Sequence, residues 1–570
     1  MKKLINDVSA VVPDMLDGLA ALNPNLSLLQ GGTIVVRADA EAIAARGQVA
    51  LISGGGSGHE PAHGGYVGPG MLSAAVAGEV FTSPSTDAVL DAIRAVAGAA
   101  GVLLIVKNYT GDRLNFGLAA EIARAEGIPV EMVVVADDVA LAANGDHAGR
   151  RGLAGTVLVH KIAGAAAAGG AALPQVAQAA RDATAAMGTM GVALTPCTVP
   201  AAGKPGFTLE DGEIEWGLGI HGEAGVERGR LVPASDAVAR LLQQIAGDLK
   251  LQAGERVALL VNNLGGTPAS ELDIVAGAAL KLLAQQGIQV ERAWAGTFLS
   301  ALEMAGISLT LLRVDDRRLA LLDAATQAPA WPAGPGRIAS DAQASSPAVA
   351  GTPATKTGAA LSASAPLARA IEAVCTRLQQ AEDLLTEMDQ KVGDGDLGIS
   401  MARAAQGIRQ DMGEWPSEQD PAAVLRAMSA TVRRVVGGTS GPLYAILLMR
   451  AAASLQRQGR AGANAWAGAF ADAVQGVMEL GGARAGDRTM VDALLPASEA
   501  LRQTLAGGGD IDAALTAATV AAEQGTAATA SMTPRRGRSS YLGQRALGHP
   551  DPGAHAVALW LGALRDALKA

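Results

Sequence analysis

Short, unbroken runs of hydrophobic residues recur through the first 335 residues of the chain, with stretches of helical character between them. Each run ends in a turn that contains Gly or Asp. Such runs are typical of strands buried on both faces of a parallel sheet, and the helical spacers indicate βαβ units. The clearest runs lie at 49–58, 101–112, 129–138 and 255–266.

The pattern changes further along the chain. Residues 331–365 are rich in Ala, Pro, Ser and Gly and have no periodicity, which is the composition of a linker. Beyond them, the regular spacing of hydrophobic residues predicts amphipathic helices, about seven to nine of them. A break near residue 190 also divides the first part. We therefore expect α/β subdomains at 1–190 and 191–330, a linker at 331–365 and an all-helical domain at 366–570.

Composition narrows the class of protein. Hydrophobic residues make up 49% of the chain and charged residues 18%, which suits large cores and argues against overall disorder. A formal charge of −10 with 3% aromatic residues argues against a protein that wraps around nucleic acid. The distant Cys197 and Cys375 exclude a disulfide scaffold and a thiolate zinc cluster. Asn6 and Asp7 interrupt any signal-peptide core, and the most apolar stretch, 162–173, is shorter than the ~20 residues of a spanning helix. We expect a cytoplasmic protein without nucleic-acid or membrane partners.

Three carboxylates cluster early in the helical half, at Asp389, Asp394 and Asp396. The glycines between them allow the backbone to fold so that the carboxylates converge. Such oxygen ligands suit Mg²⁺, which proteins usually hold through a few carboxylates and the phosphates of a substrate. An EF-hand is excluded because the required Glu is missing at position 12 in every register. A capped, solvated turn is the alternative, and spacing alone leaves both open.

Three other segments of the helical half could hold phosphate. The run GGTSGP at 437–442 precedes a helical stretch, and the free N–H groups of a helix N-terminus bind anions. The runs GDRTM at 486–490 and RRGRSSYLG at 535–543 contain arginines, which suit phosphate. Each segment alone is equally consistent with a capped turn or a solvated loop. The Walker A motif and the protein-kinase motifs are missing, so a bound nucleotide would need a different, helical scaffold.

Titratable residues follow two of the predicted strands of the α/β half. His59 comes after the glycine run SGGGSG, and Asp112 comes after the next predicted strand. Because active groups in parallel sheets gather at the carboxyl ends of strands, we expect these two side chains to act together, with His59 as an acid or base. His221 lies on a glycine-flanked turn that leaves its ring accessible to a ligand. A structural role is the alternative for each histidine.

Several motifs follow one another along both halves of the chain: GGGSGHEPAHGGYVGPGML, KNYTGDRLNFGLA, GIHGEAG, VGDGDLG, GGTSGPLY, GDRTM and GRSSYLG…GHPDPGA. Together they closely resemble the ATP-dependent dihydroxyacetone kinases, in which a substrate-binding K domain and a nucleotide-binding L domain form one chain. The resemblance spans about residues 10–560 without the linker. It implies that the helical half is an eight-helix antiparallel barrel.

The resemblance also implies residue roles. His221 would add to the ketone carbonyl and form a hemiaminal, while His59 and Asp112 would bind the substrate hydroxyls and assist proton removal. The three aspartates would hold two Mg²⁺ ions that bridge the phosphates of ATP. The full set comprises Gly55, Gly56 and Lys107 around the ketose, Asp389, Asp394 and Asp396 at the metal, and Gly398, Ser400, Ser440, Gly441, Thr489, Met490 and Arg538 at the nucleotide.

The expected protein is thus a homodimeric kinase that transfers the γ-phosphoryl group of ATP to dihydroxyacetone. Glyceraldehyde or another C3 or C4 ketose, such as erythrulose, is an alternative substrate. The resemblance leaves open a cleavage of FAD to a cyclic flavin phosphate at the same nucleotide site. It also leaves open a ketose-sensing regulator without turnover, against which the intact aspartate set argues. A phosphocarrier-dependent kinase is less favoured, because those systems usually keep the two halves on separate chains.

Overall fold

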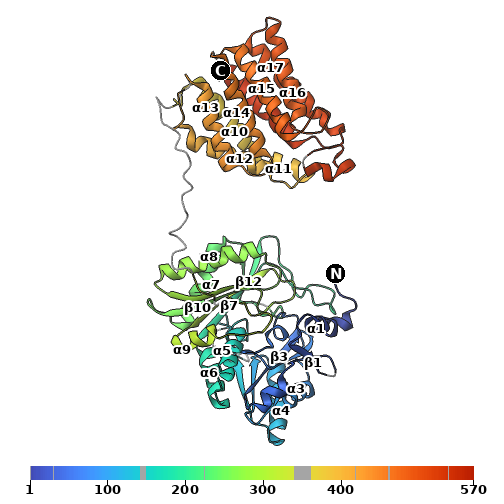
Figure 1. The fold of residues 1–570 in the computed structure, drawn as a ribbon, viewed down its shortest axis with the longest axis vertical. Helices are drawn as coiled ribbons and strands as arrows, with labels where there is room; N and C mark the ends of the chain where they lie inside the picture. The colour runs from blue at the N-terminus through green and yellow to red at the C-terminus, as the bar shows by residue number, and fades with distance from the viewer. Residues whose placement is uncertain are drawn as a thin grey trace. The chain divides into compact units, whose positions relative to one another are not determined.

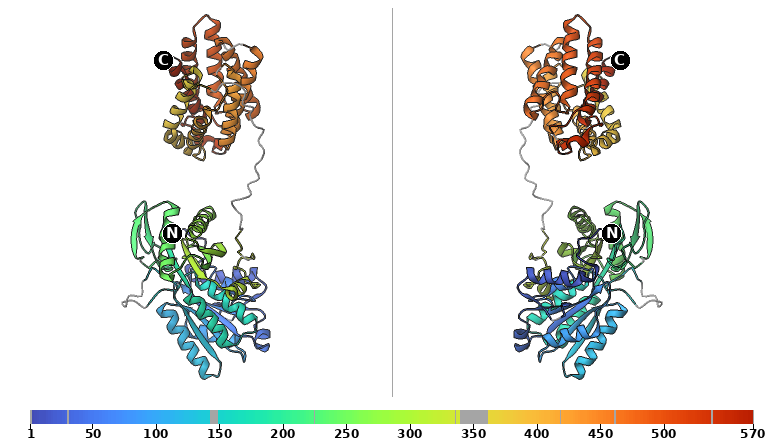
Figure 2. Two further views of the ribbon diagram at one scale, coloured as in Figure 1. Left: turned by 90° about the vertical axis from the view of Figure 1, so that its left-hand side faces the viewer. Right: turned by 90° about the vertical axis from the view of Figure 1, so that its right-hand side faces the viewer.

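The computed structural model divides the chain into two compact units, Met1–Ser346 and Pro347–Ala570 (Figures 1 and 2). None of the described helices combines the length and the hydrophobicity that a bilayer crossing requires. The residues that the structure describes are 2–29, 31–141, 149–223, 225–334, 336–338, 361–417, 419–459, 462–536 and 538–569.

The first unit begins with a six-stranded sheet in the order β1-β2-β4-β3-β5-β6. The four strands β4, β3, β5 and β6 run parallel, as the hydrophobic runs predict, and the edge pairs β1–β2 and β2–β4 are antiparallel. The strands are β1 (Leu26–Leu28), β2 (Ile34–Arg37), β3 (Ala50–Ser57), β4 (Ala74–Val80), β5 (Val102–Lys107) and β6 (Val130–Val135).

Helices cover both faces of this sheet. The core on one face includes Ile93 of α3 and Phe116 of α4, and the core on the other includes Leu158 of α5 and Val176 of α6. Continuous hydrophobic strands require this double cover. The helices are α1 (Val11–Leu22), α2 (Ala40–Ala45), α3 (Thr86–Val96), α4 (Thr110–Ala125), α5 (Thr156–Ala168) and α6 (Leu173–Ala185).

A second six-stranded sheet, in the order β11-β10-β12-β7-β8-β9, completes the first unit. The prediction of parallel βαβ units is wrong for most of it, because β10–β11 is its one parallel pair in the described residues. Its elements are β7 (Met187–Ala193), β8 (Glu213–Trp216), β9 (Glu227–Arg230), α7 (Ala234–Leu249), β10 (Arg256–Asn263), α8 (Ala269–Gln285), β11 (Gln289–Gly296), β12 (Gly306–Arg313) and α9 (Asp316–Asp323).

One hydrophobic core joins the two sheets. Ile105 of β5 and Leu260 of β10 belong to the same cluster of buried residues, together with much of α5. Residues 156–167 of α5 are all buried, and most of them are apolar, as expected for a helix that is packed on every side. The break near residue 190 therefore lies within β7, inside a continuous core.

The ends of the predicted linker pack against the two units. Trp331 is buried in the first unit, with its ring centroid 5.2 Å from that of Trp294. Leu361 is buried in the second unit, where its N–H donates to the carbonyl of Trp415. Residues 339–360 lie outside the described residues, so the linker boundaries stay a prediction.

The second unit is helical, and eight of its helices form a closed ring. The ring begins with α10 and continues with α12 through α18, without α11. Each helix of the ring contacts the next one, and α18 contacts α10. The ring surrounds an apolar cavity of about 710 Å³, so the prediction of an all-helical barrel is confirmed. The helices are α10 (Pro366–Gln380), α11 (Glu382–Gln390), α12 (Leu397–Met412), α13 (Pro421–Val435), α14 (Ser440–Gln458), α15 (Ala463–Gly481), α16 (Val491–Ala506), α17 (Ile511–Ala528) and α18 (Pro552–Lys569).

Candidate active site

The register of two neighbouring strands brings Gly55 and Lys107 together. Ser53 of β3 pairs with Ile105 of β5, and Gly55 and Lys107 each lie two residues further along. A Cβ atom on Gly55 would lie 2.7 Å from Lys107 Nζ and 3.3 Å from Asp112 Oδ2. Glycine thus leaves a gap at the strand ends, and an ammonium and a carboxylate border this gap.

His59 lies directly after β3 and is fully buried. Its Nδ1 is 2.9 Å from the carbonyl oxygen of Ser300, which can only accept, so Nδ1 carries the proton. Its Nε2 has no hydrogen-bond partner in the described part of the structure. Burial, reinforced by His221 and Lys107, lowers the pKa of His59 well below its usual value. The ring is therefore neutral and presents a lone pair at Nε2.

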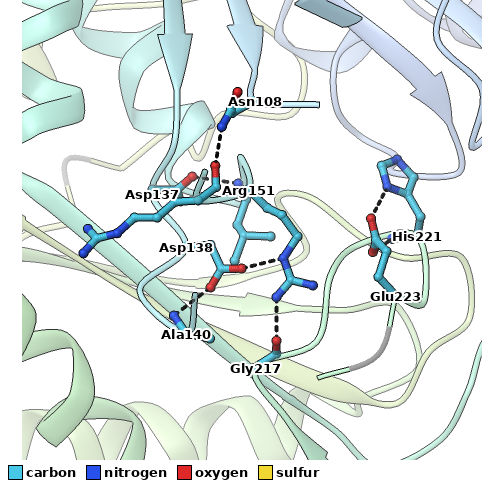
Figure 3. A network of polar contacts seen from close by, with 10 residues as sticks. Asn108, Asp137, Asp138, Ala140, Arg151, Gly217, His221 and Glu223 are labelled. Atoms are coloured by element: carbon cyan, nitrogen blue, oxygen red, sulfur yellow. Dashed lines mark hydrogen bonds and ion pairs between the residues drawn. The ribbon is translucent and has the colours of Figure 1, made fainter. Parts of the chain in front are cut away.

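His221 lies on the turn between β8 and β9 and meets His59 edge to face, with 4.8 Å between ring centroids. Tyr109 and Phe81 also border its ring, at centroid distances of 4.6 Å and 5.2 Å. Its Nδ1 is 2.9 Å from Glu223 Oε1 (Figure 3). Because a carboxylate only accepts, Nδ1 of neutral His221 donates, and the lone pair is on Nε2.

Glu223 is the anchor of this turn. Its Oε2 accepts the backbone N–H of His221 at 3.0 Å. Burial acts to raise the pKa of Glu223, but the hydrogen bonds that it accepts, together with the charge that His221 carries when protonated, outweigh burial, and the pKa lies below its usual value. A Cβ on Gly219 would overlap Glu223 Oε2 and lie 2.8 Å from Arg151 Nη1, so the two side chains meet over this glycine.

Arg151 ties the turn to the first sheet. Its Nε donates to Asp138 Oδ2 at 2.7 Å, and its Nη2 donates to the carbonyl of Gly217 at 2.6 Å (Figure 3). Asp138 follows β6 closely, and burial raises its pKa to about 6 against the opposing effect of Arg151. The His221 turn is thus fixed to the strand ends that carry Lys107 and, nearby, Asp112.

Gly56 has a packing role of its own. A Cβ there would lie 2.6 Å from the backbone nitrogen of Thr82 and 2.7 Å from the carbonyl carbon of Phe81. The glycine therefore lets the Phe81 turn approach β3. The ring of Phe81 then stacks on His59, with 5.1 Å between centroids.

The three predicted metal ligands converge in the second unit. One side-chain oxygen from each of Asp389, Asp394 and Asp396 lies within 4.8 Å of the other two. Asp389 Oδ2 accepts the N–H groups of Asp396 at 3.0 Å and Leu397 at 3.2 Å, at the start of α12. Burial raises the pKa of Asp389, and the two neighbouring carboxylates add to this effect. Such mutual repulsion is relieved by a hard divalent cation, so this donor set fits Mg²⁺.

Four of the predicted nucleotide residues lie in the first turns of α12 and α14. Gly398 is in the first turn of α12, where a Cβ would overlap the carbonyl of Glu382 and Thr386 Oγ1. Gly441 is in the first turn of α14, where a Cβ would overlap the carbonyl of Val436. Both glycines thus have a packing role that is independent of any contact with the nucleotide. Ser400 lies in the same turn of α12, and Ser440 is the first residue of α14.

The remaining nucleotide residues belong to the later motifs. The N–H of Thr489 donates to Asp492 Oδ2 at 2.9 Å, and Met490 is buried in the helical core. Arg538 begins a short 3₁₀ helix, and its side chain lies outside the described residues. The role of these residues in nucleotide binding stays a prediction.

Reasoning from the sequence missed four residues of the ketose site region. Glu223 is two residues from His221 in the same glycine-rich turn, and that spacing was a usable signal. Tyr109 borders His221 from the start of α4. His63 and His160 lie behind Lys107, and neither has a sequence pattern that indicates this position.

Two family models match the chain: the Dak1 domain over residues 17–330 and the DAK2 domain over residues 391–566. Triokinase/FMN cyclase of Homo sapiens is 46% identical over 580 residues, which cover 100% of this chain and 99% of that protein. D-erythrulose kinase of Mycolicibacterium smegmatis is 38% identical over 573 residues, which cover 98% of this chain and 97% of that protein.

A solved structure is similar over the same extent. The dihydroxyacetone kinase from C. freundii in complex with AMP-PNP and Mg²⁺ is 36% identical, with a TM-score of 0.62 and coverage of 99% of both chains. The chain therefore belongs to the single-chain, ATP-dependent dihydroxyacetone kinases. The resemblance drawn from the ordered motifs is confirmed.

Proposed function

We propose that this protein phosphorylates dihydroxyacetone, or a related short ketose, with Mg²⁺-ATP, and that His221 holds the ketose as a hemiaminal. Kinase activity follows from membership of the family. The arrangement of His221 between Glu223 and His59 is the observation that supports covalent capture. It combines an imidazole nucleophile, a carboxylate behind it and a second base beside it.

Capture would proceed by addition of His221 Nε2 to the ketone carbon. A C–N bond forms, the π bond of the carbonyl breaks, and the oxygen takes up a proton from water to become a hydroxyl, which leaves a hydroxide ion in the solvent. The alkylated ring then carries a positive charge while Nδ1 keeps its proton. Glu223 offsets this charge through the hydrogen bond at Nδ1. Glycerol has no carbonyl, so this step selects ketoses over polyols.

His59 and Asp112 would act on the hydroxyl that attacks the γ-phosphorus. His59 offers the lone pair of Nε2, and Asp112 offers Oδ2, because its Oδ1 already accepts the hydroxyl of Ser83. Either group can take the proton that the hydroxyl loses as its oxygen bonds to phosphorus. Gly55 leaves the space for the ketose, and Lys107 donates to one of its oxygens.

Asp389, Asp394 and Asp396 would hold Mg²⁺, and we propose two ions, as the family resemblance implies. When bound, Mg²⁺ offsets the charge of the ATP phosphates during transfer. Homodimer formation and a cytoplasmic location stay predictions. So does contact with the nucleotide by Gly398, Ser400, Ser440, Gly441, Thr489, Met490 and Arg538.

Release of ADP with dihydroxyacetone, glyceraldehyde, erythrulose and glycerol tests this function. The wild type is expected to turn over at least one ketose but not glycerol, and His221→Ala is expected to lose nearly all ketone phosphorylation. Arg230→Ala is the matched control, because Arg230 is exposed on the strand that follows the same turn. Unaltered turnover by His221→Ala would rule out carbonyl capture. Ketose binding by the wild type without ADP release would indicate a sensor.

A second activity, cleavage of FAD to a cyclic flavin phosphate and AMP, is favoured by the human relative, whose name includes FMN cyclase. Incubation with FAD and Mn²⁺, followed by separation of the products, tests it. We expect Asp394→Asn to lose this activity and His221→Ala to keep it, because the nucleotide site alone would carry it. Loss in both variants would contradict that assignment.

A further inference from the structure

Three buried polar side chains extend from the Gly55 gap, the space beside Gly55 that Lys107 and Asp112 border, into the interior of the first unit. Lys107 Nζ is 2.7 Å from His63 Nε2, and His63 Nδ1 is 3.0 Å from His160 Nε2. Lys107 and His160 are fully buried, and His63 is 7% exposed. The proposed reaction assigns no task to either histidine.

The elements that carry these residues meet at this place. Lys107 ends β5, His63 immediately precedes a short 3₁₀ turn, and His160 lies within the fully buried helix α5. A polar ring inside an apolar helix is unfavourable unless it is hydrogen-bonded. The partner of His160 is His63, whose Nδ1 also lies 3.4 Å from Ser53 Oγ. The other ring nitrogen of His63 meets the lysine at the edge of the gap.

The available hydrogens define the direction of these bonds. A lysine ammonium has three N–H donors and no acceptor, so His63 must accept at Nε2 and carry its own proton on Nδ1. That proton is donated to His160 Nε2. Burial and the charge of Lys107 lower the pKa of His63 well below its usual value and that of His160 to about 3. Both rings are therefore neutral acceptors beside the cation.

One donor of Lys107 remains for a ligand. The first N–H points to His63, and a second reaches the carbonyl of Gly54 at 3.3 Å. Nζ lies 2.7 Å from the place that a Cβ on Gly55 would fill, across the gap from Asp112 Oδ2. Burial lowers the pKa of Lys107, and the charge of Asp112 offsets part of this effect.

We propose that His63 and His160 are positioning residues of the ketose site. They hold Lys107 Nζ at the edge of the Gly55 gap with its remaining N–H directed at an oxygen of the bound ketose. The two histidines thus act on the substrate only through Lys107. This inference rests on the proposed ketose kinase function.

Substitution of His63 tests the first part of this inference. His63→Leu keeps apolar bulk but cannot accept, while the side-chain oxygen of His63→Gln can still accept from Lys107. We expect His63→Leu to raise the KM for dihydroxyacetone by about 10- to 100-fold, the effect of losing a hydrogen bond to a charged group, with a smaller change in kcat and none in the KM for ATP. His63→Gln should recover most of the loss.

A double-mutant cycle tests whether the effect passes through Lys107. We expect His63→Leu to add nothing to Lys107→Met, and His160→Leu to add nothing either. Leu309→Ala, which removes a fully buried side chain of β12 in another core cluster, controls for loss of stability alone. It should lower the melting temperature without raising the KM for dihydroxyacetone.

The outcomes separate this inference from the proposed function. A wild type that phosphorylates no ketose overturns both. Normal wild-type turnover with an unchanged KM in His63→Leu, or with additive effects in the cycle, overturns only the positioning role. If His63→Leu does not fold, the same cycle with His160→Leu decides, and an effect of His160→Leu in the Lys107→Met background counts against the proposal.

Discussion

His59 and His221 are held through the same ring nitrogen but by different partners, and this difference supports the separate roles that we propose for them. Both donate from Nδ1, His59 to the backbone carbonyl of Ser300 and His221 to the carboxylate of Glu223. A ring that forms a bond to carbon becomes cationic, and only His221 has a carboxylate to offset that charge. His59, which burial keeps neutral, is suited to accept a hydrogen bond or a proton.

Asp112 offers a direct test of proton removal at this scale. Asp112→Asn keeps the size and the hydrogen bond to Ser83 but removes the negative charge and most of the basicity. We expect kcat for dihydroxyacetone to fall by about 10²–10⁴-fold, the usual effect of losing an acid–base group. Steady-state kinetics with saturating ATP measure this fall. A change of less than about threefold would assign proton removal to His59 alone.

The buried His160 predicts a pH effect on stability. Its pKa is lowered to about 3 in the folded chain, whereas an unfolded chain has a value near 6.5. Below pH 6.5 the unfolded state therefore binds an extra proton, and the folded state loses stability as the pH falls. Relative to His160→Gln, the wild type should lose about 1 kcal/mol between pH 7 and 5.5. Urea unfolding at each pH, monitored through hydrogen exchange in the β3 and β5 segments, measures this change in the free energy of unfolding. A difference independent of pH would contradict it.

Some residues of the ketose site could be predicted from the sequence, and others could not. His59 and Asp112 follow strand-like runs, and parallel strands place such residues at one edge. Glu223 contacts the His221 ring from two positions along the same turn, and this spacing is visible in the sequence. His63 and His160 are 97 positions apart, and the apolar helix around His160 has no signal of its own.

At the scale of the elements, strand orientation was the feature that the sequence left undefined. The segment 255–266 is a continuous hydrophobic run, and β10 within it pairs with one parallel and one antiparallel neighbour. Burial on both faces produces the same run in either orientation. The helical half was easier, because the period of its hydrophobic residues depends only on local geometry.

The junction between α11 and α12 carries the prediction that belongs to this scale. Gly398→Ala would place a Cβ against the carbonyl of Glu382 and the hydroxyl of Thr386, separating α11 and α12, whose facing ends and connecting turn carry the aspartates. We expect a loss of about 1–3 kcal/mol in stability and weaker Mg²⁺-ATP binding. Gly413→Ala, at the other end of α12, meets open space and is the matched control. Thermal unfolding and nucleotide titration measure both. Equal behaviour of the two variants would show that the junction tolerates the methyl group.

For the whole molecule, our proposal divides the chemistry between the two compact units. The ketose site that we propose belongs to Met1–Ser346, and the aspartate cluster belongs to Pro347–Ala570. Each site is built from its own unit, so each should bind its ligand without the other. This division predicts that ketose capture requires neither Mg²⁺ nor ATP.

Asp394→Asn tests the division. We expect this variant to bind Mg²⁺-ATP weakly and to lose phosphorylation, because one of three converging carboxylates is neutralised. Its capture of dihydroxyacetone should equal that of the wild type. Isothermal titration with each ligand separates the two effects. Loss of ketose binding with normal ATP binding would reverse the assignment of the units.

The central claim is that His221 converts the bound carbonyl carbon to a tetrahedral one. The most direct measurement is a ¹³C NMR spectrum of dihydroxyacetone labelled at its carbonyl carbon and bound to the wild type, with His221→Ala as reference. We predict that the bound carbonyl resonance of the wild type is replaced by a tetrahedral carbon signal that His221→Ala lacks. A carbonyl resonance that persists in the bound wild type, or a tetrahedral signal that persists in His221→Ala, would contradict capture by this residue.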